Sequence, residues 1–269
     1  MPRAEGFLLV ESSPIDAAAV TRALHDIYIP GPETRLRAEE AQKVLEMVPL
    51  LRELAAQVKH KPATGEYVLV DAAAGRGYVS LLASKLVLAP AGKRFRWVVI
   101  EREVRRAEAV ATLAAKLGFG ASFEVRCADV ADAAAWPEAP DLVIALHSCG
   151  PAADQVIERS LAARARSLLL VPCCVSKQVR DHPRAAAAAE ALGIPRQAPV
   201  RRRFLEAVIA AERTLRLEAA GYRTEVVELC PPRVTPHNLV WRCRRSGQQK
   251  QADRSRQTLG STVRDMPPD

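Results

Sequence analysis

The spacing of apolar residues changes once along the chain, near residue 62. Before that point apolar residues recur every three or four positions, as on one face of an α-helix. The recurring residues are Val44, Met47, Val48, Leu51, Leu54, Ala55 and Val58. A break at Pro30-Gly31-Pro32 divides this part in two, and Lys61-Pro62 ends it. We therefore expect residues 1–62 to form a helical N-terminal cap.

From residue 63 to residue 245, short apolar runs alternate with helical stretches. Five runs read as strands: Tyr67–Val70, Arg96–Ile100, Phe123–Cys127, Leu142–Leu146 and Leu168–Val171. This alternation is typical of β-α-β units and a parallel sheet. Two more runs, Arg223–Leu229 and Asn238–Arg242, are joined only by a short proline-containing connection and should pair as an antiparallel hairpin at the sheet edge. The pattern predicts an α/β fold, with a disordered tail over the polar residues 246–269.

Composition and charge narrow the class of protein. The chain of 269 residues is 49% hydrophobic and 26% charged, which is enough apolar material for a full core. Its net charge of +8 suits a phosphate-rich or acidic partner. No apolar run approaches the ~20 residues of a membrane span, and the first residues lack a basic region followed by an apolar core. We expect a cytoplasmic protein with no membrane partner.

The six cysteines lie within or at the ends of the strand-like runs, which predicts reduced thiols. The adjacent pair Cys173-Cys174 has the wrong spacing for a zinc site, so no metal is expected.

An acid and two glycines follow the first predicted strand. Asp71 ends the apolar run, Gly75 and Gly77 lie in a turn of small residues, and a helix should begin near Tyr78. Glycine lets a ligand approach the main chain, and a helix start points N–H groups at it. A dinucleotide site would have a third glycine where Ser80 stands, and would not place the acid first. An acid here suits the amine of S-adenosylmethionine and disfavours an NAD-dependent oxidoreductase.

Two more acids follow the next strands. Glu101 closes the second strand, where a carboxylate can accept both hydroxyls of a ribose, and Asp129 follows the third, within reach of an adenine amino group. Each acid alone could be a solvated carboxylate at a helix start. Acids at three successive strand ends indicate a ligand, because ligands of open α/β sheets bind beyond the carboxyl ends of the strands.

Four motifs together resemble the methyltransferase-32 domain family, which includes methyltransferase-like proteins and relatives of a tRNA acceptor-stem 2′-O-methyltransferase. They are Asp71-x-x-x-Gly75-x-Gly77, Ala145-Leu146-His147-Ser148-Cys149-Gly150, Val171-Pro172-Cys173-Cys174 and Thr235-Pro236-His237-Asn238-Leu239, within residues 60–245. The resemblance implies a Rossmann-like class I methyltransferase with a seven-stranded, mostly parallel sheet.

The same resemblance implies S-adenosylmethionine as cofactor. The cofactor-binding positions are Asp71, Ala73, Gly75, Gly77, Glu101, Asp129 and Leu146. Ala73 and Ala74 stand where the family more usually has Gly or Ser.

Candidate catalytic residues follow the fourth and fifth strands. His147 could take a proton from the methyl acceptor, or it could only hydrogen-bond the adjoining loop. Cys149 and Cys173 lie in the regions where RNA 5-methylcytosine enzymes place their cysteines, one of which attacks the base. Packing of small buried thiols is the competing interpretation.

The substrate class is predicted from charge and family together. Arg196 and Arg201, Arg202 and Arg203 could meet phosphates, or could form a solvated basic face. Aromatic content is only 4%, and no RNA-binding module with interleaved aromatics is present. RNA, including tRNA, is the predicted substrate. A small-molecule or protein methyltransferase is the alternative, followed by a non-catalytic binding module.

Overall fold

A computed structural model describes residues 15–29, 38–59, 65–172, 174–235 and 238–246. The α-helices are α1 (Ala17–Tyr28), α2 (Ala38–Lys59), α3 (Tyr78–Ala83), α4 (Val104–Lys116), α5 (Ala152–Ala162), α6 (His182–Ala191) and α7 (Pro199–Ala219). The strands are β1 (Tyr67–Ala72), β2 (Phe95–Glu101), β3 (Phe123–Cys127), β4 (Leu142–Leu146), β5 (Ser167–Val171), β6 (Tyr222–Glu228) and β7 (Leu239–Arg245). A π-helical turn, Ser84–Leu88, continues α3, and short 3-10 turns lie at Gly120–Ser122 and Ala133–Ala135.

The seven strands form one sheet in the order β3-β2-β1-β4-β5-β7-β6. The first five strands are parallel, β7 is antiparallel to β5, and β6 is antiparallel to β7. The predicted seven-stranded α/β fold is therefore confirmed, including the terminal antiparallel hairpin. The later strand of that hairpin, β7, is the one inserted next to β5, which leaves β6 at the edge.

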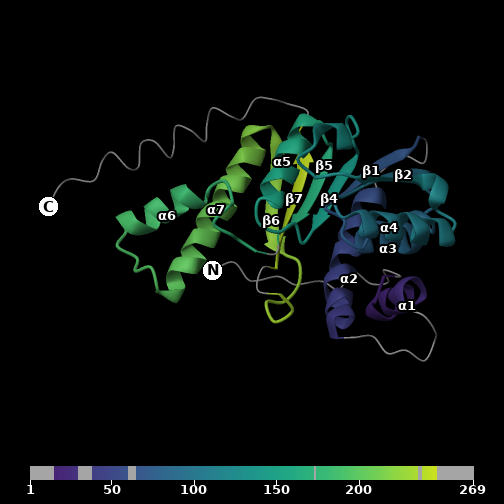
Figure 1. Ribbon diagram of the computed structural model, residues 1–269, viewed down its shortest axis with the longest axis horizontal. Helices are drawn as coiled ribbons and strands as arrows, with labels where there is room; N and C mark the ends of the chain where they lie inside the picture. The colour runs from purple at the N-terminus through teal and green to yellow at the C-terminus, as the bar shows by residue number, and fades with distance from the viewer. Residues whose placement is uncertain (1–14, 30–37, 60–64, 173, 236–237, 247–269) are drawn as a thin grey trace, which may run out of the picture.

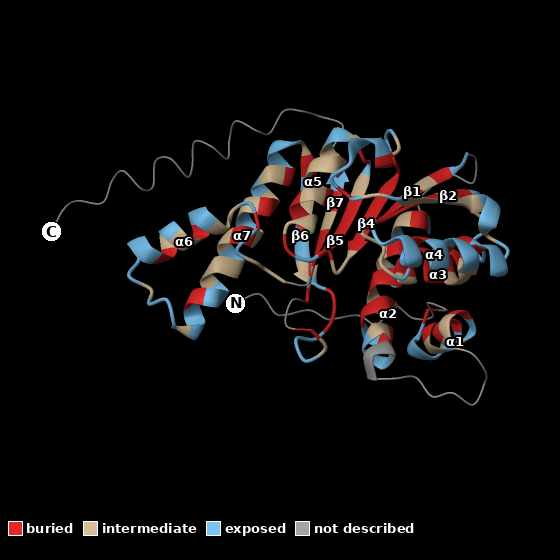
Figure 2. Ribbon diagram, in the orientation of Figure 1, coloured by how far each residue is buried: buried red, intermediate tan, exposed pale blue. Residues whose placement is uncertain are grey.

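Helices cover both faces of the sheet (Figure 1). Apolar side chains of α1, α2, α3 and α4 pack on one face, and those of α5 and α7 pack on the other. The inner strands β1, β2, β4 and β5 are buried on both faces, which explains their mostly apolar sequence. The edge strand β6 has only one buried position, Tyr222 (Figure 2).

The N-terminal helices belong to the main core. Met47, Leu51 and Leu54 of α2 are fully buried in the same cluster as Leu69 of β1 and Trp97 of β2. The predicted break at residues 30–32, the predicted helix end at residues 61–62 and the tail beyond residue 246 lie outside the described residues. No helix in the described ranges combines the length and the apolar character that a membrane crossing requires.

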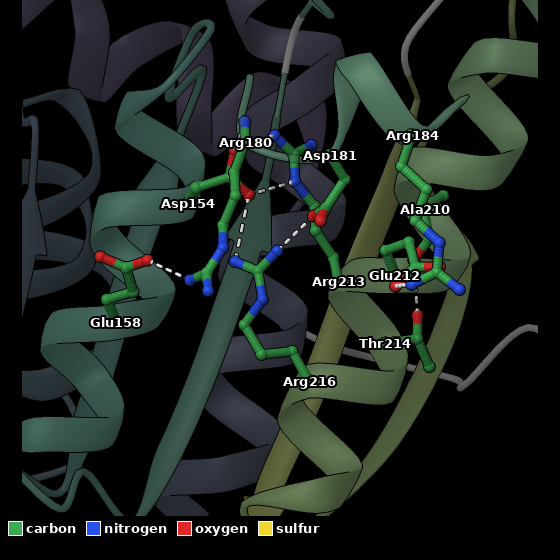
Figure 3. A network of polar contacts seen from close by, with 10 residues as sticks. All are labelled: Asp154, Glu158, Arg180, Asp181, Arg184, Ala210, Glu212, Arg213, Thr214 and Arg216. Atoms are coloured by element: carbon green, nitrogen blue, oxygen red, sulfur yellow. Dashed lines mark hydrogen bonds and ion pairs between the residues drawn. The ribbon is translucent and has the colours of Figure 1, made fainter. Parts of the chain in front are cut away.

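A network of charged groups joins α5, α7 and the loop after β5 (Figure 3). Asp154 of α5 lies at its centre. It accepts hydrogen bonds from Arg213 (3.0 and 3.4 Å), from Arg216 (3.5 Å) and from the backbone N–H of Arg180 (3.3 Å). Arg216 also pairs with Asp181. These contacts attach α7 to the sheet and fix the segment that leads into α6.

Candidate cofactor and methyl-transfer site

Two of the predicted cofactor residues, Asp71 and Glu101, lie on neighbouring strands at the carboxyl edge of the sheet. In the register of the sheet, Asp71 of β1 lies beside Ile144 of β4, and Glu101 of β2 lies beside Cys127 of β3. The loops that follow β1, β2, β3 and β4 therefore begin at neighbouring points. The sequence predicts a ligand at this edge, and the strand order places the four loops along it.

The loop after β1 turns through three residues with left-handed backbone conformation. Ala73, Gly75 and Gly77 have φ angles of 56°, 60° and 72°. A Cβ added to Gly75 would meet no atom within 4 Å, so the main chain is open there to a ligand. A Cβ added to Gly77 would lie 2.8 Å from Val110 of α4, so this glycine serves close packing instead.

Asp71 is buried at the start of this loop. Its side chain is 1% exposed and accepts a hydrogen bond from the backbone N–H of Ser80 in α3 (3.1 Å). Burial raises the pKa of Asp71 to about 6, the Ser80 hydrogen bonds oppose the rise, and nearby Glu101 adds to it. Within the described part of the chain, no cationic side chain pairs with this carboxylate.

Glu101 connects the loops after β1 and β2. One carboxylate oxygen accepts the N–H of Gly75 (2.7 Å), and the other accepts the N–H of Glu103 (2.9 Å). Its position is thereby fixed beside the turn of the cofactor loop. Asp129 lies on the exposed surface after β3, where its side chain accepts the N–H of Ala131 (2.9 Å).

Helix α1 also reaches the cofactor loop, which the sequence did not predict. The Tyr28 hydroxyl donates to the carbonyl of Arg76 (3.0 Å), and the Tyr28 ring lies 4.6 Å from that of Tyr78. The Arg76 guanidinium lies over both rings, at 5.4 and 5.6 Å from their centres. No local pattern could identify these contacts, because 48 positions separate Tyr28 from Arg76.

His147 begins the loop after β4. Its φ angle is 59°, in the left-handed region, and its N–H donates to the carbonyl of Val171 at the end of β5 (2.8 Å). Its Nε2 lies 2.7 Å from Oε2 of Glu46, a buried residue of α2. Lys43 also contacts Oε2 (2.9 Å). Burial raises the pKa of Glu46, but the hydrogen bonds from His147 and Lys43 outweigh it and lower the pKa to about 2.

The other motif residues have varied surroundings. Cys149 is exposed and disulfide-bonded, so the prediction of reduced thiols is wrong for this residue. Cys173, Pro236 and His237 lie outside the described residues. Asn238 closes the loop between β6 and β7 by donating to the carbonyl of Cys230 (2.6 Å).

The arginines just before α7 and in its first turn differ from one another. Arg201 is buried and donates to the carbonyls of Ile194 (2.7 Å) and Ala186 (3.4 Å), so it ties α6 to α7. Arg202 pairs with Glu206 (3.1 Å), and Arg196 pairs with Glu190 (3.1 Å), at the surface.

Comparison with protein families identifies the class. Residues 39–181 match a family described as a methyltransferase domain, the methyltransferase-32 family. The match covers more than half of the chain, and it begins within α2, earlier than the motifs themselves. The chain therefore belongs to this family and is an S-adenosylmethionine-dependent methyltransferase.

Solved structures with a similar chain course include two other methyltransferases and a pre-rRNA processing protein. Magnesium protoporphyrin IX methyltransferase from Synechocystis PCC 6803 has 14% identity, a TM-score of 0.49 and coverage of 84% of this chain and 93% of that one. Fibrillarin, a pre-rRNA processing protein from Methanococcus jannaschii, has 13% identity, a TM-score of 0.46 and coverage of 73% and 75%. Mitomycin 7-O-methyltransferase has 18% identity and a TM-score of 0.42; the match covers 78% of this chain and 59% of that one.

At these identities the likeness concerns the fold alone, and we draw no substrate from it. No curated protein sequence matches the chain at a significant level.

The residues at the carboxyl edge fit S-adenosylmethionine. Open space at Gly75 permits close approach to the main chain, and the Glu101 carboxylate is held beside it. Asp71 is a buried carboxylate with no cationic partner among the described residues, as expected for a group near a ligand amine.

Proposed function

We propose that this methyltransferase acts on RNA and that His147 accepts the proton which the methyl acceptor loses. The observation that carries the choice of RNA is a cavity of about 260 Å³ beside the cofactor loop, lined by Tyr28, Arg76, Arg105, Arg106, Ala109 and Leu113. Its arginines offer the planar donors that bind phosphate.

The charges around this cavity are only partly neutralised. Arg106 pairs with Glu103 (2.7 Å). Among the described residues, no carboxylate contacts the guanidinium of Arg76 or of Arg105, although both are exposed. Arginines that lack a carboxylate partner and adjoin the cofactor loop suit the phosphate backbone of a substrate.

Each candidate residue has a distinct task in the proposed reaction. The bound cofactor supplies the methyl group as an electrophile. Asp71 would hold the ligand amine, Glu101 would accept the ribose hydroxyls, and Asp129 would bind the adenine amino group. Ala73, Gly75, Gly77 and Leu146 shape the loop and strand end against which the cofactor lies. His147 takes the acceptor proton, which leaves the acceptor atom able to attack the methyl carbon.

A covalent route through Cys149 or Cys173 is the alternative chemistry. Because Cys149 is disulfide-bonded in the structure, this route through Cys149 would first require a thiol reductant to open that disulfide. A thiolate would then attack the base and leave after methylation, so a variant lacking one cysteine would stop turnover or trap an adduct. We expect Cys149→Ala and Cys173→Ala each to retain methyl transfer. A stable protein–RNA adduct on a denaturing gel would establish the covalent route instead.

The substrate class is tested by transfer of tritium from labelled S-adenosylmethionine to separate total-RNA, tRNA, protein and metabolite fractions. We expect label in RNA. Label confined to protein or to small molecules would overturn the RNA assignment while leaving the methyltransferase activity established.

The arginine-lined cavity is tested with Arg105→Ala, because Arg105 lies outside the cofactor loop. We expect KM for RNA to rise about tenfold with affinity for S-adenosylhomocysteine unchanged, since one phosphate contact is lost. The matched control is Arg223→Ala, which removes one exposed positive charge from the edge strand β6. Equal effects from the two variants would mean that net charge, and not this cavity, recruits RNA.

A further inference from the structure

We propose that Glu46 of α2 is a positioning residue for His147, so that the helix preceding the sheet completes the methyl-transfer site. This inference rests on the proposed role of His147 as the base. It assigns a catalytic purpose to a contact between two segments that lie 101 positions apart in the sequence.

The Glu46 carboxylate is built into the protein and is not a surface group. Glu46 is 1% exposed, and three side chains contact its two oxygens. Oε2 receives His147 Nε2 (2.7 Å) and Lys43 Nζ (2.9 Å), and Oε1 receives Gln42 Nε2 (3.3 Å). A buried carboxylate with this many donors has a fixed orientation.

The same cluster extends to the opposite side of the site. Gln42 Nε2 also donates to the carbonyl of Val234, in the loop between β6 and β7 (3.0 Å). Through Gln42 and Glu46, α2 therefore connects the loop after β6 with the loop after β4. These are two of the loops at the carboxyl edge where the methyl acceptor must lie.

An acceptor at Nε2 determines the state of the imidazole ring. The Glu46 carboxylate can only accept, so a neutral His147 carries its proton on Nε2 and its lone pair on Nδ1. Nδ1 is then the nitrogen that takes the acceptor proton. The resulting imidazolium lies against an ionised carboxylate, which stabilises the positive charge as it develops.

The backbone of His147 also indicates a required position. A left-handed conformation is uncommon for a residue other than glycine and costs free energy. Here the N–H bond to Val171 and the Nε2 contact with Glu46 hold both ends of the residue. The side chain retains 26% exposure, so the ring is anchored and still accessible.

The decisive variant is Glu46→Gln, which keeps the shape of the side chain and removes its charge. We expect kcat to fall roughly 10- to 100-fold with affinity for S-adenosylhomocysteine unchanged. The acidic limb of the rate–pH profile should move to lower pH, because imidazolium is less stable without the carboxylate. Other groups in this environment, Lys43, Cys230 and Glu228, remain in place and are common to both profiles.

The matched control is Glu53→Gln, the same substitution two turns later on α2. Glu53 is half-buried and pairs with Arg242 of β7, so its loss tests the packing of α2 without touching His147. Glu46→Asp serves as the conservative variant and should restore the wild-type pH limb and part of the rate, and the melting temperature of each variant reports its folding.

Comparison with His147→Ala separates the possible failures. If His147→Ala loses activity while Glu46→Gln keeps the wild-type rate and pH limb, the positioning role is overturned and the base assignment stands. If His147→Ala stays fully active, both are overturned. If Glu46→Gln and Glu53→Gln lose rate equally, with unchanged pH limbs, Glu46 serves only to pack α2.

Discussion

Two buried aspartates on opposite faces of the sheet differ in whether arginine side chains pair with them. Asp154 of α5 is 4% exposed and contacts the guanidinium groups of Arg213 and Arg216 (Figure 3). Asp71 of β1 is 1% exposed and accepts the N–H of Ser80, and in the described chain it has no cationic partner. Arginines of the protein neutralise the Asp154 carboxylate, whereas no described side chain neutralises that of Asp71.

The difference separates architecture from function. A buried charge is costly unless it is paired. The protein itself meets that requirement at Asp154, where the pairing attaches α7 to α5. At Asp71 the requirement appears instead as a raised pKa, of about 6, which a cationic ligand would relieve. Buried carboxylates of the first kind stabilise the fold, and those of the second kind indicate where a ligand binds.

The largest effect that we expect is a loss of stability when Asp154 is replaced. Asp154→Ala would leave Arg213, which is 2% exposed at its side chain, as a buried charge without its carboxylate. The free energy of unfolding should fall by about 3–5 kcal/mol. Urea denaturation measures it. A loss below about 1 kcal/mol would mean that Asp154 does not carry the attachment of α7.

The control for Asp154 is Glu158→Ala, one turn later on α5. Glu158 pairs with Arg180 (2.6 Å), but both side chains are largely exposed, at 42% and 58%. Exposed pairs contribute about 0–1 kcal/mol, so this variant should unfold close to the wild type.

The sequence predicted most of the fold because the information was local. Each inner strand is an apolar run bounded by polar residues, and the acids Asp71 and Glu101 follow their strands directly. The parallel order then places their ends along one edge. Pattern and position were sufficient to predict that Asp71 and Glu101 lie near one another at this edge.

The remaining features depend on contacts between distant segments. Glu46 has the local appearance of an exposed helix residue three positions after Lys43, yet it is buried against His147. Arg201 has the appearance of part of a basic surface, yet it is buried against the carbonyls of Ile194 and Ala186. Periodicity gives no information on which carboxylate or carbonyl a distant polar group will meet.

A smaller effect is expected on cofactor affinity when Glu101 is replaced. Like Asp71, Glu101 is buried and accepts hydrogen bonds from backbone N–H groups. Glu101→Ala removes the proposed ribose acceptor, so affinity for S-adenosylhomocysteine should fall by roughly 2–3 kcal/mol, or about 100-fold. Calorimetric titration measures it. Glu103→Ala, which removes an exposed side chain two residues later, should bind normally; equal affinity in wild type and Glu101→Ala would show that the ribose partner is misassigned.

The smallest effect, and the sharpest test of the contrast, is the pH dependence of cofactor binding at Asp71. In the free protein the pKa of Asp71 is raised to about 6. A bound ligand with a protonated amine favours the ionised carboxylate, so binding releases a proton wherever free Asp71 is protonated. Affinity for S-adenosylhomocysteine should therefore be constant above ~pH 7 and weaken about tenfold by ~pH 5.

The stability of the free protein should depend on pH with the opposite sign. A raised carboxyl pKa makes the native state bind more protons than the unfolded state between ~pH 4 and 6. The contribution of Asp71 to the free energy of unfolding therefore decreases as the pH rises through that range.

The control ligand is 5′-methylthioadenosine, which lacks the amino-acid end. It should bind with the same affinity at both pH values, and comparing the two ligands cancels contributions from other groups that titrate. In Asp71→Asn, the pH dependence of affinity should be the same for the two ligands. If the wild type already shows the same pH dependence for both ligands, or the difference persists in Asp71→Asn, the amine is held elsewhere, and Asp71 supports the loop in the way that Asp154 supports α7.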